Sequence, residues 1–452
     1  MYTYQDLLDV PENDKDRIDF VRKVISDHQS SKLYKQAVRA YKYFDGENET
    51  LMDYQKTIVR ITGEVIPDLY SASHKSPSNY IERFVTQLNQ FLLGNGITWN
   101  DPKTEKIVGE AFDEEVQDAG ENAILGAVSF GFWNYDHVDI FKIIEFAPLW
   151  DEIDGSLKSG VRWWQVDASK PMRATLYEPD GLTDYIWDKE NGEGRILNPK
   201  RKYIDNIVQS GIDGTRIMDG ENYPSFPVVP CWASKRHVNI IARYLAGVDA
   251  YDFIKNGYTN DFDEAQLYWI IKGAGGMDDP DLVRFLDRLK TVKAAAPADG
   301  QEVEAVTVEI PYEAREKLLD RIDKDLYSDF MALDFASVVN GADTATQIKA
   351  AYDPLNKRAD KLEWGITHFI KAILNIVNVD DYPTYTRSVI VNTQEEIQTL
   401  LLAANYLSSD YVTTKILTLL GDKDKVEEVL NQMSADEIER LGNDDEETVD
   451  ET

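Results

Sequence analysis

The stretch of residues 311–377 constrains the fold more than any other part of the chain, because it holds two long helical patterns separated by a short break. In the first pattern, apolar side chains recur at three- and four-residue steps, which predicts an amphipathic helix over residues 311–333. The break, residues 335–346, is rich in turn-forming residues. The second helix crosses Pro354, whose missing backbone hydrogen bond predicts a kink near Asp353. No catalytic motif lies here, so the pattern favours a structural role, in which the protein positions another molecule.

The charge of the chain limits its partners. Its 48 Lys and Arg residues oppose 81 Asp and Glu residues, which gives a net charge of -33 at pH 7. Simple attraction to nucleic acid or to an anionic membrane is therefore not expected, since both need basic patches. The single cysteine, Cys231, excludes an internal disulfide framework and cysteine metal clusters and indicates a reducing compartment.

Targeting signals are not found. Residues 1–10 lack the basic start of a signal peptide, and the longest apolar run, residues 123–133, is shorter than the roughly 18 residues that a membrane helix needs. We therefore expect a soluble protein of the cell interior or of a virion. Its 452 residues allow roughly three domains of about 150 residues each.

Helical patterns dominate the first 130 residues. They cover residues 18–25, 33–41, 79–92, 107–116 and 119–130. Ser78 or Asn79 is expected to cap the third of these helices, and Gly94 to end it.

Short runs rich in Val, Ile, Trp and Tyr follow from residue 135, separated by turn dipeptides. They predict an antiparallel sheet with strands at residues 138–146, 161–167, 172–178, 182–188 and 203–209. Because successive side chains of a strand point to opposite faces, one of Trp163 and Trp164 should be buried and the other exposed.

A small αβ module is predicted between two helices. Residues 238–259 have a helical pattern, and residues 267–272 and 303–310 have the composition of strands. A helix between these strands is marked by Leu282, Phe285, Leu286 and Leu289. Because the next helix starts at residue 311, the module is most simply an insertion at the tip of a helix pair.

The C-terminal part is predicted to hold a short strand at residues 387–391 and compact helices at residues 394–407, 411–420, 425–433 and 436–441. Residues 442–452 contain six acidic side chains and should be disordered. All these elements together predict an α+β protein that is predominantly helical.

Catalytic motifs are weak. The dipeptide Gly-Lys never occurs, which excludes a P-loop ATPase, and residues 94–96 lack the third glycine and the preceding strand of a dinucleotide site. Residues 127–131 approximate a nucleophile elbow at Ser129, with His137 or His237 as candidate bases. An elbow needs a strand before its serine, whereas the pattern here is helical. We therefore interpret Ser129 as a small residue in a packed helix.

Metal-binding patterns are equally weak. The five histidines form no HExxH motif and no close pair on one face. Residues 422–428 resemble half of a calcium loop without its sixth-position glycine. With 81 carboxylates in the chain, no single acidic pair indicates glycoside chemistry. We expect no metal, no cofactor and no enzymatic activity.

The predicted kinked helix is less acidic than its surroundings. Its cations are Lys349, Lys357, Arg358, Lys361 and Lys371. They fit ordinary surface charge with i,i+4 partners such as Asp360 and Glu363. They also fit sparse contacts with phosphates, and the sequence leaves both interpretations open.

Eight segments carry a resemblance to a known family. They are NYIERFVTQLNQFLLGNGITW (79–99), AILGAVSFGFWNY (123–135), RWWQVD (162–167), ATLYEPDGLTDYIWD (174–188), IIKGAGG (270–276), DLVRFLDRLK (281–290), VEIPYEAREKLLDRIDKDLY (308–327) and GADTATQIKAAYDPLNKRADKLEWGITHFIKAIL (341–374). In type and order they resemble the portal proteins of tailed bacteriophages, specifically the family of the Bacillus phage SPP1 portal. The resemblance covers residues 61–433.

The resemblance implies a ring of identical subunits, twelve in the assembled particle, at one vertex of the capsid. Double-stranded DNA would pass through the ring without sequence-specific binding. The implied parts are a wing (1–235), a stem helix (236–262), a clip (263–310), a second stem helix (311–334), a tunnel loop with the kinked helix (335–379), a crown (380–441) and a disordered acidic tail (442–452). The protein would be made in the host bacterial cytoplasm and end in the virion.

The resemblance also implies partners and contact residues. Terminase and head-completion or adaptor proteins would meet the clip, and scaffolding protein and the major capsid protein would surround the ring. The residues implied at the clip are Lys272, Asp278, Asp279, Arg284 and Arg288. Those implied in the DNA channel are Asn340, Gly341, Asp343, Thr344, Thr346, Gln347 and Lys349. Changing Asp343 or Lys349 should alter packaging or DNA retention without preventing ring assembly.

Two other functions compete with this interpretation. A soluble hydrolase or carbohydrate-active enzyme would use Ser129 or an acidic pair, and replacing Ser129 would abolish its activity. An acidic scaffold or adaptor protein would bind other proteins and form no ring with a hole wide enough for duplex DNA.

Overall fold

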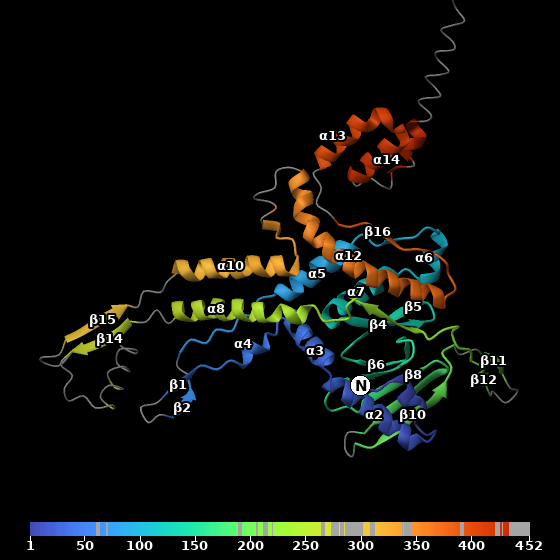
Figure 1. The fold of residues 1–452 in the computed structure, drawn as a ribbon, viewed down its shortest axis with the longest axis horizontal. Coiled ribbons are helices and arrows are strands. Elements are labelled where there is room, and N and C mark those ends of the chain that lie inside the picture. Colours follow the sequence, from blue (N-terminus) through green and yellow to red (C-terminus); the bar gives the residue numbers. More distant parts are fainter. Residues whose placement is uncertain are drawn as a thin grey trace, which may run out of the picture. The chain divides into compact units, whose positions relative to one another are not determined.

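The computed structural model describes residues 1–59, 64–68, 71–188, 192–204, 207–210, 216–218, 220–263, 267–272, 280, 284, 302–307, 312–336, 338, 345–388, 393–420, 425–426 and 428–433. The chain divides into two compact units. Unit 1 comprises Met1–Ala332 and Asp360–Thr386, and unit 2 comprises Leu333–Ala359 and Arg387–Thr452. Figure 1 labels the helices and strands, whose mixture agrees with the predicted α+β class.

The first helices of unit 1 begin at clear capping residues. α2 (Asp14–Ser30) and α3 (Lys32–Phe44) confirm two predicted helices, whereas the short α1 (Tyr4–Leu8) and α4 (Glu49–Asp53) are not predicted. Asn13 Oδ1 accepts from the Asp16 N–H (2.9 Å) at the start of α2. Ser31 Oγ accepts from the Tyr34 N–H (3.2 Å) in the same way at α3.

The next helices lie partly away from their predicted places. α5 (Tyr80–Leu93) confirms the helix predicted at residues 79–92, with Asn79 at its N-cap position. α6 covers Pro102–Val108 and α7 covers Phe112–Gly126, so the helices predicted at residues 107–116 and 119–130 are wrong in their boundaries. The backbone explains this, because Gly109 (φ 95°) and Ala127 (φ 75°) both take a positive φ that ends a helix.

Two antiparallel sheets follow α7. The three-stranded sheet has the order β13-β4-β5, and the five-stranded sheet has the order β10-β9-β8-β7-β6. The strands are β4 (Val128–Asn134), β5 (His137–Lys142), β6 (Phe146–Trp150), β7 (Leu157–Trp164), β8 (Met172–Glu178), β9 (Gly181–Trp187), β10 (Gly194–Arg201) and β13 (Val228–Trp232).

Two strand predictions need correction, and strands also form where none was predicted. The strand predicted at residues 138–146 is split into β5 and β6, because the Glu145 N–H donates to the Lys142 carbonyl (3.0 Å) and closes a turn. β10 was not predicted, since most of its side chains are exposed and it lacks apolar alternation. Of the strand predicted at residues 203–209, the end lies in β11 (Ile207–Ser210), which pairs with β12 (Arg216–Met218), residues 203–204 lie outside any strand, and residues 205–206 are not among the described residues.

An apolar core joins α2 to the five-stranded sheet. Its buried members include Val21, Val24 and Ile25 of α2 and Val161 and Leu176 of the sheet. Trp163 belongs to this core and is 8% exposed, whereas Trp164 is 36% exposed. The predicted division between the two tryptophans is therefore confirmed.

His28 connects this helix to the turn between β5 and β6. Its Nε2–H donates to the Ile143 carbonyl oxygen (2.8 Å), and its ring packs edge-on against that of Trp163, with 5.8 Å between centroids. Burial lowers the pKa of the imidazole below its usual value of 6.5.

The lowered pKa of His28 predicts a loss of stability in acid. Below pH 6.5 the unfolded chain binds a proton at His28, whereas the folded chain does not, because its pKa is lower. The stability that neutral His28 contributes is therefore fully present above pH 6.5 and is lost as pH falls toward the folded pKa. His28→Gln keeps a donor for Ile143 but cannot titrate. In denaturant titrations between roughly pH 7 and pH 5, this variant should lose less stability than the wild type. Equal losses would contradict the prediction.

The predicted insertion between two helices has the predicted order of elements. The short 3-10 helix η1 (Ile241–Arg243) leads into α8 (Leu245–Asp263), so the helix predicted at residues 238–259 starts later. β14 (Leu267–Lys272) pairs antiparallel with β15 (Glu302–Thr307), and α10 (Tyr312–Phe330) follows. The helix predicted from Leu282, Phe285, Leu286 and Leu289 lies outside the described residues.

The long helix α12 (Ala345–Ile376) includes Pro354, which does not end it, and the predicted kink stays a prediction. From Asp360 onward α12 belongs to unit 1 and buries one face, which includes Ile366, Phe369 and Ile373. It approaches its neighbours through glycines. A Cβ at Gly131 of β4 would touch the Phe369 ring, and a Cβ at Gly365 would lie under 3.0 Å from the Trp232 carbonyl oxygen.

The remaining elements complete the two units. In unit 1, β1 (Thr57–Val59) pairs with β2 (Val65–Pro67), and β16 (Thr384–Tyr385) pairs with β3 (Ile97–Thr98). Of the strand predicted at residues 387–391, residues 387–388 are not in a strand, and the others lie outside the described residues. Unit 2 contains α13 (Thr393–Ala403), η2 (Ala404–Tyr406) and α14 (Ser409–Leu420), and residues 428–433 are helical. The helix and tail predicted at residues 436–441 and 442–452 are not among the described residues.

Candidate functional site

The helix pair α8 and α10 is the candidate functional element of unit 1. The two helices run antiparallel and side by side (Figure 1). At one end the Tyr244 ring, just before α8, packs edge-on against Phe330, with 5.3 Å between centroids. At the other end Arg315 Nη1 forms an ion pair with Asp261 Oδ2 (2.5 Å). Contacts at both ends keep the helices together along their length.

The far end of the pair leads into the two-stranded antiparallel sheet of β14 and β15, whose six residue pairs run from Leu267↔Thr307 to Lys272↔Glu302. This sheet belongs to the predicted clip. Lys272 is the last residue of β14, and Arg284 is exposed. The other predicted contact residues, Asp278, Asp279 and Arg288, lie outside the described residues.

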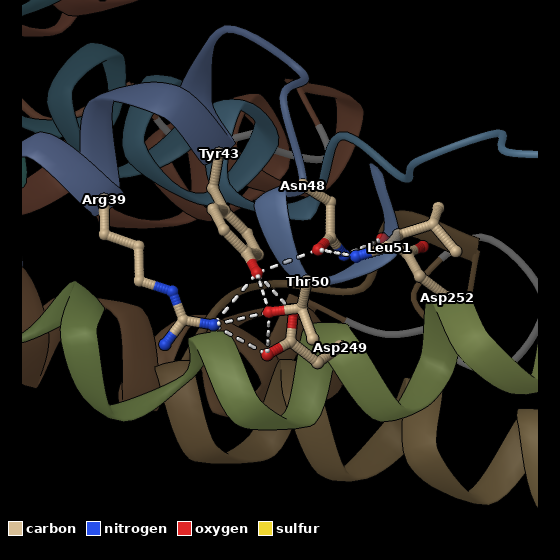
Figure 2. Close-up of polar contacts among 7 residues, drawn as sticks. All are labelled: Arg39, Tyr43, Asn48, Thr50, Leu51, Asp249 and Asp252. Carbon is tan, nitrogen blue, oxygen red and sulfur yellow. Dashed lines mark hydrogen bonds and ion pairs between the residues drawn. The ribbon is translucent and has the colours of Figure 1, made fainter. Parts of the chain in front are cut away.

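The near end of α8 is held by a polar cluster that Figure 2 draws. Arg39 of α3 forms an ion pair with Asp249 (Nη2 to Oδ2, 2.8 Å), and Thr50 Oγ1 donates to the same oxygen (3.2 Å). The Tyr43 hydroxyl contacts the other Asp249 oxygen and also lies 2.8 Å from Asn48 Oδ1. Burial and the hydrogen bond to Asp249 raise the pKa of this hydroxyl.

Asn48 extends the cluster by one helical turn. Its Oδ1 caps α4 by accepting from the Leu51 N–H (3.0 Å), and its Nδ2 donates to Asp252 Oδ2 (2.7 Å). Asp252 is completely buried, and burial raises the pKa of its carboxyl although Asn48 and Ser78 donate to it. The cluster offers no nucleophile paired with a base, so its evident task is to fix α8 to α3 and α4.

A ladder of hydrogen bonds continues along the same face of α8. Asp252 Oδ1, Asn256 Oδ1 and Asn260 Oδ1 accept from the backbone N–H groups of Ser78 (3.0 Å), Ser76 (2.7 Å) and His74 (2.7 Å), respectively. Four helical residues rise about 6 Å, and two extended residues rise about 6.6 Å, so the two spacings match. We call residues 71–79 the strap. In a sheet, these backbone N–H groups would donate to a neighbouring strand. Here they donate to side chains of the helix α8.

Helix α5, which follows the strap, contacts α10. The Tyr80 hydroxyl donates to Asp323, and Arg83 Nη1 donates to the Tyr327 hydroxyl (2.7 Å). Beside these contacts lies an open cavity of about 450 Å³, lined by residues that include Lys255 of α8 and Asp320 of α10. The residues that line this cavity carry charges of both signs, but they form no arrangement suited to acid–base or nucleophilic chemistry.

The predicted channel residues are only partly described. Gln347 and Lys349 are exposed in the first turns of α12, and Thr346 precedes them in the same helix. Asn340, Gly341, Asp343 and Thr344 lie outside the described residues. Nothing in the described part therefore brings these seven residues together or separates them.

The basic side chains of α12 have different environments. Lys357 forms an ion pair with Asp353 (2.6 Å), so its i,i+4 partner precedes it and is not Asp360 or Glu363. Arg358 is buried, which excludes it from the predicted phosphate contacts. Lys371 lies over the Tyr382 ring, 4.1 Å from its centroid. Lys349 and Lys361 remain exposed.

Ser129 is not a catalytic serine of the elbow type. It lies within β4, not in the predicted helix, and is completely buried. Its Oγ donates to the Ala119 carbonyl oxygen (2.7 Å). The candidate bases have other partners, since His137 contacts Asp136 (2.9 Å) and His237 stacks on Trp232 at 3.7 Å between centroids. The interpretation as a small packed residue is right, but the element is a strand.

The described residues contain neither a metal-binding cluster nor a membrane-spanning helix. No group of three or more His, Cys, Asp or Glu side chains there could hold a metal ion. None of the helices there is long and apolar enough to cross a membrane.

Comparison with known proteins gives a family match. Residues 139–449 match the family model described as phage portal protein, SPP1 Gp6-like. The portal protein of Clostridium phage phiCD119 is 28% identical over 251 residues, which cover 48% of this chain and about half (54%) of that protein. The portal protein of Bacillus phage SPP1 is 22% identical over 413 residues, which cover 84% of this chain and 79% of that protein.

Two solved structures have a partial likeness. One is a chain of the virion of a native gene transfer agent particle, with a TM-score of 0.39 and 12% identity. The other is a chain of the neck of such a particle, computed with C12 symmetry, with a TM-score of 0.38 and 10% identity. Each match covers 75% of this chain and 89% of the other. At these TM-scores the likeness says nothing about function.

Proposed function

The chain belongs to the SPP1 Gp6-like family of phage portal proteins, and from this membership we propose that it forms the ring-shaped connector between head and tail at one capsid vertex. The observation that supports this role is the helix pair α8 and α10, which carries a two-stranded sheet at one end and is fixed by buried and partly buried polar contacts at the other. Such a rigid lever, repeated around a ring, suits head-to-tail contacts between different faces of neighbouring copies.

In this proposal double-stranded DNA passes through the ring during packaging and ejection. Twelve copies would carry a net charge of -396, twelve times the -33 of one chain. This charge repels phosphates, so DNA would slide through without being held or read by sequence. The channel contacts are assigned to Asn340, Gly341, Asp343, Thr344, Thr346, Gln347 and Lys349, of which Gln347 and Lys349 are exposed.

The remaining parts have proposed roles as well. The clip, residues 263–310, would dock terminase during packaging and head-completion proteins afterwards. The wing (1–235) and the crown (380–441) would meet scaffolding and capsid proteins, and the helices at 236–262 and 311–334 would form the stem. The virion is the expected location of the assembled ring.

The proposal predicts rings in the purified protein. Electron microscopy combined with particle mass should show closed rings with a central hole wide enough for a DNA duplex. The alternative gives another result, because an acidic adaptor protein would appear as monomers or dimers. Monomers alone, in the presence as well as the absence of scaffolding protein, would contradict the portal assignment.

A further inference from the structure

Large apolar side chains gather on the surface around the turn between α13 and α14. They are Leu401 (56% exposed), Leu402 (80%), Tyr406 (91%), Leu407 (41%) and Tyr411 (48%). We call these five residues the turn patch. Single exposed apolar residues are ordinary in soluble proteins, but a cluster of this kind marks a surface that a partner covers.

The same segment is almost without charge. Residues 397–414 contain one charged side chain, Asp410, whereas 29% of the residues of the whole chain are charged. At the average frequency, eighteen residues would hold about five charges. The turn patch is thus apolar and lies in a segment that lacks the high acidic content of the rest of the chain.

The helices that carry the turn patch bury little of their own surface. Among the described side chains of α13, η2 and α14, Val412 is the one that is buried. Helices of 11 and 12 residues are marginal by themselves and derive their stability from packing. A surface supplied by another molecule would give these helices the core that they lack.

We propose that the turn patch is covered by the neighbouring copy of this chain in the assembled ring. The inference rests on the proposed function, which places identical copies side by side. Charge selects this occupant. Each copy carries a net charge of -33, so acidic faces of two copies repel each other, and an apolar surface without carboxylates lets the copies approach closely. The turn patch is such a surface on every copy.

The geometry of a ring sets what the patch meets. In a head-to-tail ring one face of each subunit contacts a different face of the next. The patch would therefore lie against another surface of the neighbouring α13 and α14, where uncharged side chains such as Thr413, Leu417 and Leu420 are available. Leu420, at the end of α14, is 57% exposed.

Thiol protection tests the proposal directly. Leu402→Cys places a reactive group in the patch, and Ile153→Cys and Val166→Cys place it at two similarly exposed apolar positions of unit 1 (89% and 83% exposed). The native Cys231 does not interfere, because burial raises the pKa of its thiol to about 12. In purified rings, a maleimide should label Cys at 402 at least tenfold more slowly than Cys at 153 or 166. In the monomer the rates should be similar.

A charge variant gives an independent readout. Leu402→Asp should raise the protein concentration needed for rings at least tenfold, whereas Ile153→Asp should leave it unchanged. Rings in which Cys at 402 reacts as fast as in the monomer would overturn the inference and leave the portal function standing. Protection that needs an added scaffolding or capsid protein would also overturn it, since another protein would then cover the patch. If the wild type forms no rings, the proposed function and this inference fall together.

Discussion

Replacing Gly365 with alanine is expected to destabilise unit 1 severely. Gly365 lies in the buried part of α12, where a Cβ would come under 3.0 Å from the Trp232 carbonyl oxygen and close to its carbonyl carbon. Overpacking substitutions commonly cost about 1–3 kcal/mol, and this one should reach or exceed the upper value because the neighbouring atoms belong to the backbone. We expect little soluble protein, or a melting temperature lowered by several degrees.

The backbone at Trp232 has no room to retreat. Trp232 pairs with Val128 in the three-stranded sheet, and its ring stacks between Trp150 (5.7 Å between centroids) and His237 (3.7 Å). A shift of α12 away from β13 would in turn lift Phe369 off Gly131. Either adjustment breaks other contacts of the core, so relaxation cannot absorb the extra methyl group.

Gly257→Ala is the matched control. Gly257 also lies inside a helix of unit 1, but a Cβ there meets nothing within 4 Å. Alanine should stabilise α8 by up to about 1 kcal/mol, because it loses less conformational freedom than glycine. Thermal unfolding of both variants checks the pair of predictions. A Gly365→Ala protein as stable as the wild type would mean that α12 does not approach Trp232 as closely as described.

The sequence predicted those elements whose environment is uniform along their length. α2, α3, α5 and α10 each have one apolar face, so their periodicity is visible. The failure at α7 and β4 has a specific cause. Residues 123–133 are buried on all sides, which removes any period, and the helix ends at Ala127, a residue type that seldom adopts a positive φ.

The candidate site was harder to predict than the fold. Two strands between two helices were predicted correctly from residues 238–333, but the polar face of α8 was not. Asp252, Asn256 and Asn260 are four residues apart, and Asp and Asn are poor helix formers, so their repetition on one face was an available signal. Their burial depends on the strap, which lies more than 170 residues earlier in the chain. No local pattern contains that contact.

Asp252→Ala is expected to release the strap from α8. The substitution leaves the Ser78 N–H and the Asn48 amide without the acceptors that they have at 3.0 Å and 2.7 Å. A buried donor without a partner costs about 1–3 kcal/mol. Asn48 cannot simply turn to water, because its Oδ1 is held by the Leu51 N–H and the Tyr43 hydroxyl. Asp252→Asn should be intermediate, since it keeps one acceptor but turns an amide donor toward Asn48.

Trypsin cleavage after Lys75 measures the release, because this residue lies within the strap. The peptide nitrogen of the bond to be cut belongs to Ser76, which donates to Asn256 Oδ1 (2.7 Å), and the Ser76 carbonyl accepts from Asn256 Nδ2 (3.0 Å). Asn256→Ala should therefore expose the bond most directly. A loss of about 1.4 kcal/mol in local stability corresponds to roughly tenfold faster cleavage when opening is at equilibrium.

Asp261→Ala separates this effect from a general weakening of α8. Asp261 is on the same helix and pairs with Arg315 (2.5 Å), but its side chain is 42% exposed. Exposed ion pairs contribute about 0–1 kcal/mol, so cleavage after Lys75 should change little in this variant. Faster cleavage in the Asp252 and Asn256 variants alone would show that the side-chain ladder holds the strap. Equal rates in all three variants would mean that the strap is held by other contacts, such as that of Lys56 Nζ with the Ala72 carbonyl (2.9 Å).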